Sequence, residues 1–175
     1  MPADLRAQIG KKRPFDSPEE EAYLNILRTG SEMDAAFARL FRRHGLTHST
    51  YNALRILRGH QPEGAASSII GGQLVSRVPD VTRLVDRLVE AGLAERGRAG
   101  DDRRVVKVRI TREGLALLAR LDRPVRELHV RQLGHLTRAD LAMLSALLAR
   151  ARERCGPETG SAARSAHRRR SSTTL

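Results

Sequence analysis

The sequence predicts a mainly α-helical fold with one small β-hairpin, and three observations lead to this class. Hydrophobic residues make up 40% of the 175-residue chain, but aromatic residues only 3%, and tryptophan is absent. A core of Leu, Val, Ile and Ala favours helices packed on helices. Apolar residues recur at helical spacing through most of the chain, and the period changes to two only over 93–100 and 105–111.

Helix start and stop signals divide the chain before the hairpin into four helices. Ser17, followed by Pro18 and three glutamates, predicts a helix over 18–44, which Gly30 and Ser31 could bend or split. The next two helices are expected over 48–59 and 67–76, separated by a loop over 60–66, with Ser67 or Ser68 as cap of the second. The fourth starts at Pro79 and ends in a left-handed cap at Ala91-Gly92.

Two further helices follow the hairpin. Thr111 to Gly114 predicts the start of a long helix over 112–134, which Pro124 should kink. Thr137 and Asp140 fit a capping box, with Asp where Glu or Gln is usual, and open a last helix that ends near Cys155.

The charge of the chain indicates a polyanionic partner. The formal net charge is +12, of which residues 1–17 carry +2 and residues 156–175 carry +3, so the central segment keeps +7. A basic folded body is typical of nucleic-acid-binding proteins, although the arginine use of a GC-rich genome is the competing interpretation. We expect a flexible basic arm over 1–17, one domain over 18–155 and a disordered basic tail over 156–175.

Several classes of protein are disfavoured. The sequence has no run of 18 apolar residues and no apolar segment at its N-terminus, so a cytoplasmic protein without a membrane span is expected. It has no GxxxxGK[ST], HExxH, GxSxG or paired CxxC motif, so neither an enzyme nor a cofactor is expected. The histidine pairs 44/48 and 129/135 are poorly spaced for a metal, and we expect none. Cys155, at a helix end, is more consistent with an incidental thiol than with a redox sensor.

The order of the elements has a physical meaning. Two consecutive helices joined by a tight turn, the second of them amphipathic, form a helix-turn-helix, and the hairpin that follows is a wing. In the second helix, Val81, Leu84 and Leu88 mark a buried stripe, and Arg83 points roughly opposite it. Such a helix fits the major groove of double-stranded DNA.

The hairpin tip, 99-AGDDRRVV-106, places two acids before two arginines. Arg103 and Arg104 are expected to enter the minor groove, where Arg is the favoured side chain, and Asp102 is expected to orient one of them. The alternative is a solvated tip whose acids merely offset its arginines.

From Leu46 to Gly114 the chain resembles the MarR family of winged helix-turn-helix regulators. The runs that carry the resemblance are 82-TRLVDRLVEAGLAER-96 and 102-DRRVVKVRIT-111. One departure is 69-IIGGQL-74, where two glycines weaken a short helix. The resemblance implies a winged helix-turn-helix head over 46–111 with N- and C-terminal dimerisation helices over 18–44 and 112–154. It also implies a homodimer that binds a palindromic operator, in most cases as a repressor.

The candidate DNA contacts lie on the predicted recognition helix, on the turn before it and on the wing. Arg83 is expected to reach a base edge. For Arg87 the alternative is a salt bridge to Asp86 or Glu90. Arg96 and Arg98 are either backbone contacts or surface charge, and Ser49 and Thr50 are weaker phosphate candidates. The candidate site is Ser76, Arg77, Thr82, Arg83, Arg87, Asp102, Arg103 and Arg104.

Two functional questions stay open at this stage. Members of this family often respond to small aromatic or phenolic acids, and an arginine beside aromatic residues suits such an effector. The alternative is that these residues are core. The candidates are Phe37, Phe41, His44, Tyr51 and Arg55. The alternative function for the whole chain is a basic architectural protein that coats DNA without sequence preference.

Overall fold

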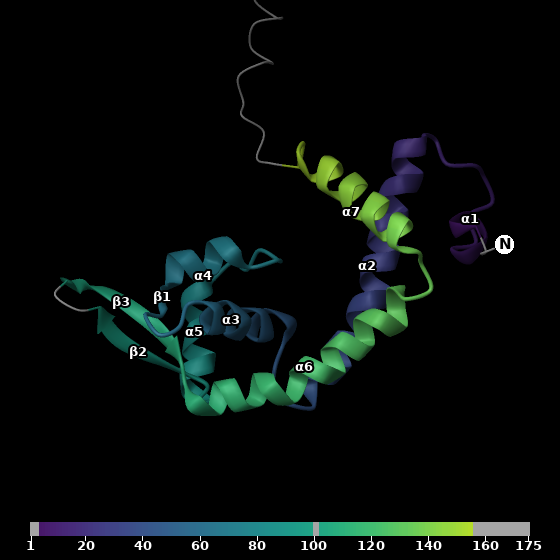
Figure 1. Cartoon of the computed structure of the whole chain (residues 1–175). Helices are drawn as coiled ribbons and strands as arrows, with labels where there is room; N and C mark the ends of the chain where they lie inside the picture. Colours follow the sequence, from purple (N-terminus) through teal and green to yellow (C-terminus); the bar gives the residue numbers. More distant parts are fainter. Residues whose placement is uncertain (1–3, 100–101, 156–175) are drawn as a thin grey trace, which may run out of the picture. The chain divides into compact units, whose positions relative to one another are not determined.

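The structure of the protein is a computed structural model that describes residues 4–99 and 102–155, with the backbone alone for 98, 99 and 102–105. The chain divides into two compact units, residues 1–132 and 133–175. The first unit holds all three strands and the helices up to α6, and the second holds α7 (Figure 1). The predicted tail over 156–175 lies outside the described residues.

The first long helix, α2 (Pro18–Arg42), starts as the sequence predicts. The Ser17 side chain accepts a hydrogen bond from the Glu20 N–H at 3.1 Å. The helix is unbroken through Gly30 and Ser31. It is followed by α3 (His48–Gly59), which begins at a capping box formed by Thr47 and Thr50.

The segment predicted to be a flexible arm contains a one-turn helix, α1 (Leu5–Gln8). The Asp4 side chain accepts from the Arg6 N–H at 3.3 Å, and Leu5 is buried. Lys11 pairs with Glu20 in the first turn of α2 at 3.6 Å. Four residues are too few to show an apolar period, so the sequence pattern could not reveal this helix.

The sheet has three antiparallel strands in the order β1-β3-β2: β1 (Ala65–Ala66), β3 (Asp102–Ile110) and β2 (Ala94–Ala99). The predicted hairpin of β2 and β3 is confirmed, and it extends away from the helices as a two-stranded ribbon in Figure 1. The prediction of a loop throughout 60–66 is wrong at its end, because Ala65 and Ala66 pair with Val108 and Lys107. Two residues show no alternation from which a strand could be recognised.

Helices α4 (Ser67–Gln73) and α5 (Val81–Glu90) form the helix-turn-helix together with the turn between them. A serine cap of α4 was expected, but the capping position is Ala66, the last residue of β1, whose methyl side chain cannot accept a hydrogen bond. Helix α5 was expected to start at Pro79, but it begins at Val81, with Asp80 as its N-cap. Its predicted left-handed end is confirmed, since Gly92 has φ of 67°.

After the wing, α6 (Arg112–Leu133) continues as one helix through Pro124, and it is curved in Figure 1. The Thr111 hydroxyl fixes its start, accepting from the Gly114 N–H at 3.1 Å and donating to the Gly92 carbonyl at 2.8 Å. The last helix, α7 (Arg138–Arg152), begins at the predicted capping box of Thr137 and Asp140.

The core lies in the first unit, where α3, α5, the sheet and the first half of α6 meet. Its most deeply buried side chains come from all four and also from α2 and α4: Leu54 and Leu57, Val85 and Leu88, Val108, Leu118 and Leu121, Phe41, and Ile70. The core is mainly aliphatic, as the composition predicts, and Phe37, Phe41 and Tyr51 are its aromatic members. The helix α7 has no buried residue.

Candidate nucleic-acid interface

Helix α5 separates its apolar and polar faces as the sequence predicts. Leu84, Val85 and Leu88 are buried, whereas Thr82, Arg83 and Arg87 are exposed. The Asp80 carboxylate accepts from the Arg83 N–H at 2.9 Å and so fixes the first turn. The exposed residues of α5 therefore present a hydroxyl, two guanidinium groups and, at the end of the helix, the Glu90 carboxylate.

The turn before α5 is held by a residue that sequence reasoning did not single out. The Asn52 side chain on α3 accepts a hydrogen bond from the Val75 N–H at 2.8 Å. The turn residues Ser76 and Arg77 are exposed, and Val75 is 87% exposed. Asn52 thus ties the turn to the rigid helix α3.

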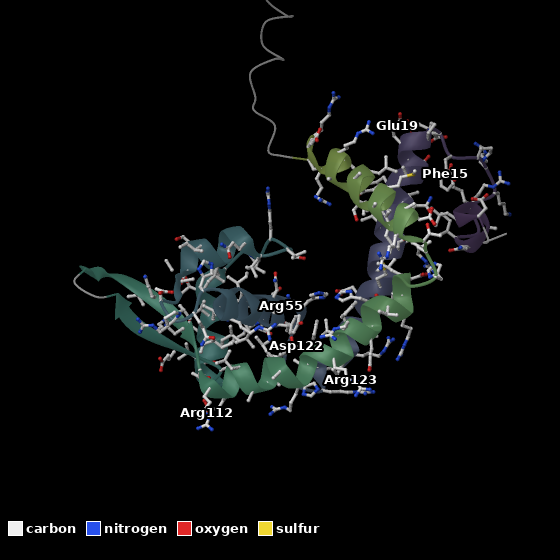
Figure 2. All side chains as sticks on the ribbon, viewed as in Figure 1. Phe15, Glu19, Arg55, Arg112, Asp122 and Arg123 are labelled. Atoms are coloured by element: carbon white, nitrogen blue, oxygen red, sulfur yellow. The ribbon has the colours of Figure 1, made fainter. Side chains whose placement is uncertain are left out.

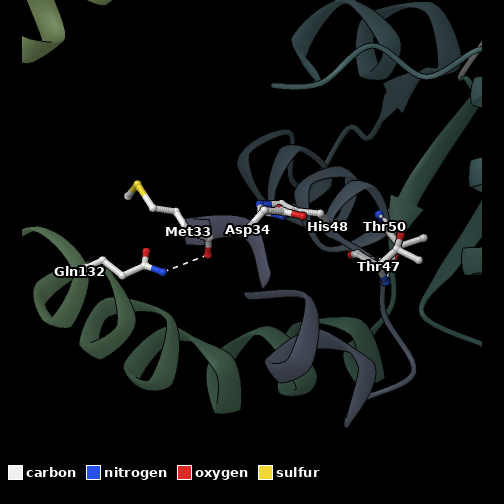
Figure 3. A network of polar contacts seen from close by, with 6 residues as sticks. All are labelled: Met33, Asp34, Thr47, His48, Thr50 and Gln132. Carbon is white, nitrogen blue, oxygen red and sulfur yellow. Dashed lines mark hydrogen bonds and ion pairs between the residues drawn. The ribbon is translucent and has the colours of Figure 1, made fainter. Parts of the chain in front are cut away.

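A shallow cleft of about 370 Å³ joins the start of α3 to the start of α5. Ser49, Arg83 and Arg87 all line it. Thr50, the other predicted phosphate contact at this helix start, is buried. Its hydroxyl accepts from the Thr47 N–H at 2.8 Å, so it serves as a cap and is not available to a ligand (Figure 3 shows the pair).

Asp86 of α5 pairs with a different arginine from Arg87, the partner that the sequence suggested. The Asp86 carboxylate pairs with Arg96 of β2 at 2.7 Å (Nη2 to Oδ1), and not with Arg87. In the described part of the chain neither Arg83 nor Arg87 forms an ion pair. The intrahelical salt bridge suggested for Arg87 is therefore absent from the described residues. Arg96 forms an ion pair with α5, so the interpretation of Arg96 as mere surface charge does not hold.

The wing tip is described only in part. Asp102, Arg103 and Arg104 belong to β3, and Asp102 pairs with Ala99 after a register irregularity between Arg98 and Ala99. Their side chains lie outside the described residues, as does that of Arg98, so the predicted minor-groove contacts and the orienting role of Asp102 stay predictions.

The candidate effector residues gather around α3, with one exception. Phe41 stacks on Tyr51 with ring centroids 4.3 Å apart, and Phe37 lies 6.0 Å from Phe41. Both phenylalanines are buried, as the core interpretation expects. His44 is exposed in the turn after α2 and lines none of the described pockets, because α2 ends at Arg42 and Gly45 reverses the chain with φ of 67°.

Two histidines outside the predicted effector set, His48 and His129, lie beside its phenylalanines. His48 has its ring 5.3 Å from Phe41, and its Nδ1 shares a 2.5 Å hydrogen bond with Asp34 (Figure 3). His129 has its ring 4.8 Å from Phe37. His129 follows the buried Leu121 and Val125 at helical spacing, and this extension of the apolar stripe is a signal that could have identified it.

A pocket of about 390 Å³ lies between α3 and α6. Arg55 on α3 and Asp122 on α6, both labelled in Figure 2, contribute to its lining. Asp122 is bound by both guanidinium nitrogens of Arg58, at 2.8 and 3.0 Å. The pocket is lined by Tyr51, Arg55, Arg58, Asp122, Val125, Arg126 and His129.

The electrostatics of this pocket favour an anion. The hydrogen bond from Arg58 lowers the pKa of Asp122, and the charges of Arg58, Arg55 and Arg126 lower it further. Among the described residues Arg55 and Arg126 form no ion pair of their own. The Tyr51 hydroxyl is buried and has no hydrogen-bond partner in the same part of the chain.

Other kinds of site find no support in the described ranges. No three His, Cys, Asp or Glu side chains of those residues come together so that they could hold a metal ion. Cys155 is exposed after the end of α7. None of the described helices combines the length and apolar character needed to cross a membrane.

Comparison with known proteins identifies relatives over this same region. No family model matches the sequence. The chain is 30% identical over 117 residues to the HTH-type transcriptional regulator PapX of Escherichia coli, covering 67% of this chain and 71% of that protein. It is 32% identical over 112 residues to the HTH-type transcriptional repressor IacR of Pseudomonas putida, covering 63% and 65%.

Solved structures agree. A MarR transcription factor from Planctomyces limnophilus is 45% identical, with a TM-score of 0.60, over 78% of this chain and 98% of that one. A mutant of E. coli MarR complexed with operator DNA is 23% identical (TM-score 0.67; 85% and 99% covered) and shows the same fold. So does the organohalide-sensing regulator RdhR bound to 2,4-dichlorophenol, at 16% identity (TM-score 0.71; 82% and 86% covered). The chain belongs to the MarR family of winged helix-turn-helix proteins, which are transcription regulators and not enzymes.

Proposed function

We propose that this MarR-type regulator acts as a homodimeric repressor on a palindromic operator. The observation that carries the proposal is the exposed face of α5, where Arg83 and Arg87 have no ion pair among the described residues while the neighbouring acid is held by Arg96. Arginines left unpaired in the free protein are available to base edges and phosphates. The complex of E. coli MarR with operator DNA supports this use of the fold.

The proposed contacts divide by their chemistry. Arg83 reads a base edge, with Thr82 and Arg87 beside it, and Ser76 and Arg77 in the preceding turn bind phosphates. On the wing, Arg103 and Arg104 enter the minor groove, and Asp102 orients one of them. The head over 46–111 is carried by dimerisation helices over 18–44 and 112–154, and a two-fold axis between the copies sets the spacing of the half-sites. The partner is chromosomal DNA, so the proposed location is the cytoplasm.

The test compares duplexes at fixed salt. At about 150 mM salt the protein should prefer the DNA upstream of its own gene to random duplex by about a thousandfold or more. Arg83→Ala should lower operator affinity by roughly 10- to 100-fold and relax the preference at one base position. Arg42→Ala removes the same charge from the exposed end of α2 and serves as the control, with little effect expected. A weak binder that is indifferent to sequence would instead match the architectural alternative.

A second part of the proposal concerns the effector. The pocket between α3 and α6 offers the Tyr51 ring and two guanidinium groups without ion pairs among the described residues, which suits a small aromatic acid or phenol. The binding of 2,4-dichlorophenol by RdhR supports this ligand class. Benzoate and 2,4-dichlorophenol should each release operator DNA from the wild-type protein. Arg55→Gln should weaken release by benzoate more than release by the phenol, because only benzoate carries a carboxylate. Release that is unaffected by this substitution would place the effector elsewhere.

A further inference from the structure

One ion pair joins the recognition helix to the wing. The Arg96 guanidinium of β2 lies 2.7 Å from the Asp86 carboxylate of α5. In the ladder, Ala94 faces Ile110 and Arg96 faces Val108. Ala94, Ile110 and Val108 are all buried, and cross-strand partners project from the same face of a sheet. Arg96 therefore occupies a core-facing position on β2, and its charged end reaches Asp86 at the rim of the core.

The pair contributes little to folding stability. Its side chains are 40% and 38% exposed, and exposed ion pairs are weakly stabilising because water screens them. Its position suggests a different use. Asp86 precedes Arg87 directly and follows Arg83 by three residues, on the helix proposed to face DNA. A carboxylate without a partner at this place would repel the phosphates, and Arg96 neutralises it.

We infer that the Asp86–Arg96 ion pair holds the wing on the recognition helix, so that both elements contact DNA as one unit and the two residues determine specificity by positioning. This inference rests on the proposed function. If the pair is broken, Arg96 becomes free to bind any phosphate, which strengthens binding to every duplex alike. At the same time the wing is no longer fixed in position relative to α5. This lowers the affinity only for the duplex that both elements recognise together. The ratio between the two affinities must therefore fall.

The test uses two variants that remove one negative charge from the same helix. Asp86→Asn breaks the pair, whereas Glu90→Gln changes an exposed residue that forms no ion pair among the described residues. The probes are the duplex that the wild-type protein enriches from a random-sequence pool and a scrambled duplex of the same composition. Asp86→Asn should bind the scrambled duplex more tightly and lower the affinity ratio about tenfold. Glu90→Gln should shift both affinities equally and leave the ratio unchanged.

Two further measurements test the inference even where a single substitution disturbs folding or where no operator is found. The reversed pair, Asp86→Arg with Arg96→Asp, should restore most of the ratio that each single reversal loses. In the free protein, amide hydrogens of residues 94–97 should exchange faster in Asp86→Asn than in Glu90→Gln, at similar melting temperatures. Equal exchange in the two variants overturns the inference. If the wild-type protein enriches no duplex, the proposed function fails, and the exchange comparison still decides whether the pair holds the wing.

Discussion

At the scale of single residues, the Tyr51 hydroxyl is unusual. It is buried and has no hydrogen-bond partner among the described residues, although burying a hydroxyl without a partner costs about 1–3 kcal/mol. Its ring is held firmly by stacking on Phe41. Tyr51 lines the pocket that also presents Arg55, so a bound ligand with an acceptor group could satisfy the hydroxyl. Buried polar groups without a partner are few in native proteins, so this hydroxyl calls for an explanation, and a ligand in the pocket supplies one.

We therefore expect Tyr51→Phe to separate stability from ligand binding. Without ligand, the variant should be as stable as the wild type or more stable by up to about 1 kcal/mol, because no hydrogen bond is lost. Its affinity for benzoate should fall roughly tenfold, as measured by titration calorimetry. Tyr23→Phe is the control, since Tyr23 lies on α2 and does not line the pocket. A Tyr51→Phe variant with reduced stability and unchanged benzoate affinity would contradict the assignment.

Gly114 shows that one missing side chain can determine how two elements meet. A Cβ atom at this position would collide with the Leu93 carbonyl and lie 2.7 Å from the Ile110 side chain. The glycine thus lets the first turn of α6 pack directly on the chain between α5 and β2.

Gly114→Ala should therefore destabilise the protein by about 1–3 kcal/mol, through overpacking that the backbone cannot relieve easily. Gly72→Ala is the matched control. Gly72 lies in α4 with nothing near its Cβ position, and the alanine should stabilise that helix by about 0.5–1 kcal/mol. Urea unfolding of both variants measures the two effects, and a tolerated alanine at Gly114 would mean that α6 can shift away from Leu93.

At the scale of elements, the sequence predicted the helices and strands in which the apolar pattern repeats over several residues. The stripe of α5 and the alternation of β3 each extend over several residues, so both elements and the outward direction of Arg83 were predictable. Helix α1 and strand β1 contain four and two residues, which are too few to establish a period. The partner of Asp86 was missed for another reason. Arg96 is ten residues away and reaches Asp86 only once the sheet has packed on the helix.

The link between α3 and α6 has a predictable pH dependence. The hydrogen bond from Arg58 lowers the pKa of Asp122 in the folded protein. A carboxylate with a lowered folded pKa contributes stability that is present above its unfolded pKa, about 3.9, and is lost as the pH falls through the folded pKa. Asp122→Asn should cost about 0.5–1 kcal/mol at neutral pH, because the pair is half-exposed and screened by water.

Thermal unfolding across pH tests this directly. The difference between the wild type and Asp122→Asn should stay constant from neutral pH down to about pH 5 and shrink below about pH 4. A difference that persists unchanged to the lowest pH would show that the aspartate acts through packing and not through its charge.

At the scale of the whole molecule, apolar surface remains that the described chain does not cover. On α2, Tyr23, Ile26 and Leu27 are 47% to 61% exposed. On α7, Met143, Leu144 and Leu147 are 39% to 64% exposed, and no residue of that helix is buried. These helices flank the head in the sequence and take no part in the DNA contacts proposed above. Exposed apolar residues grouped along two helices are typical of an interface between protein chains, and a second copy is the proposed partner.

A charge placed on this surface should separate the two copies. Leu27→Glu would bury a carboxylate without a partner in the proposed interface, so the mass in solution should fall from twice 19.4 kDa to 19.4 kDa, as measured by light scattering. Operator affinity should fall with it, because one head contacts only one half-site. Val75→Glu is the control, since Val75 is even more exposed but lies in the turn before α5. This control should keep the dimer mass and lose DNA affinity, so a Leu27→Glu variant that remains a dimer would place the interface on another surface.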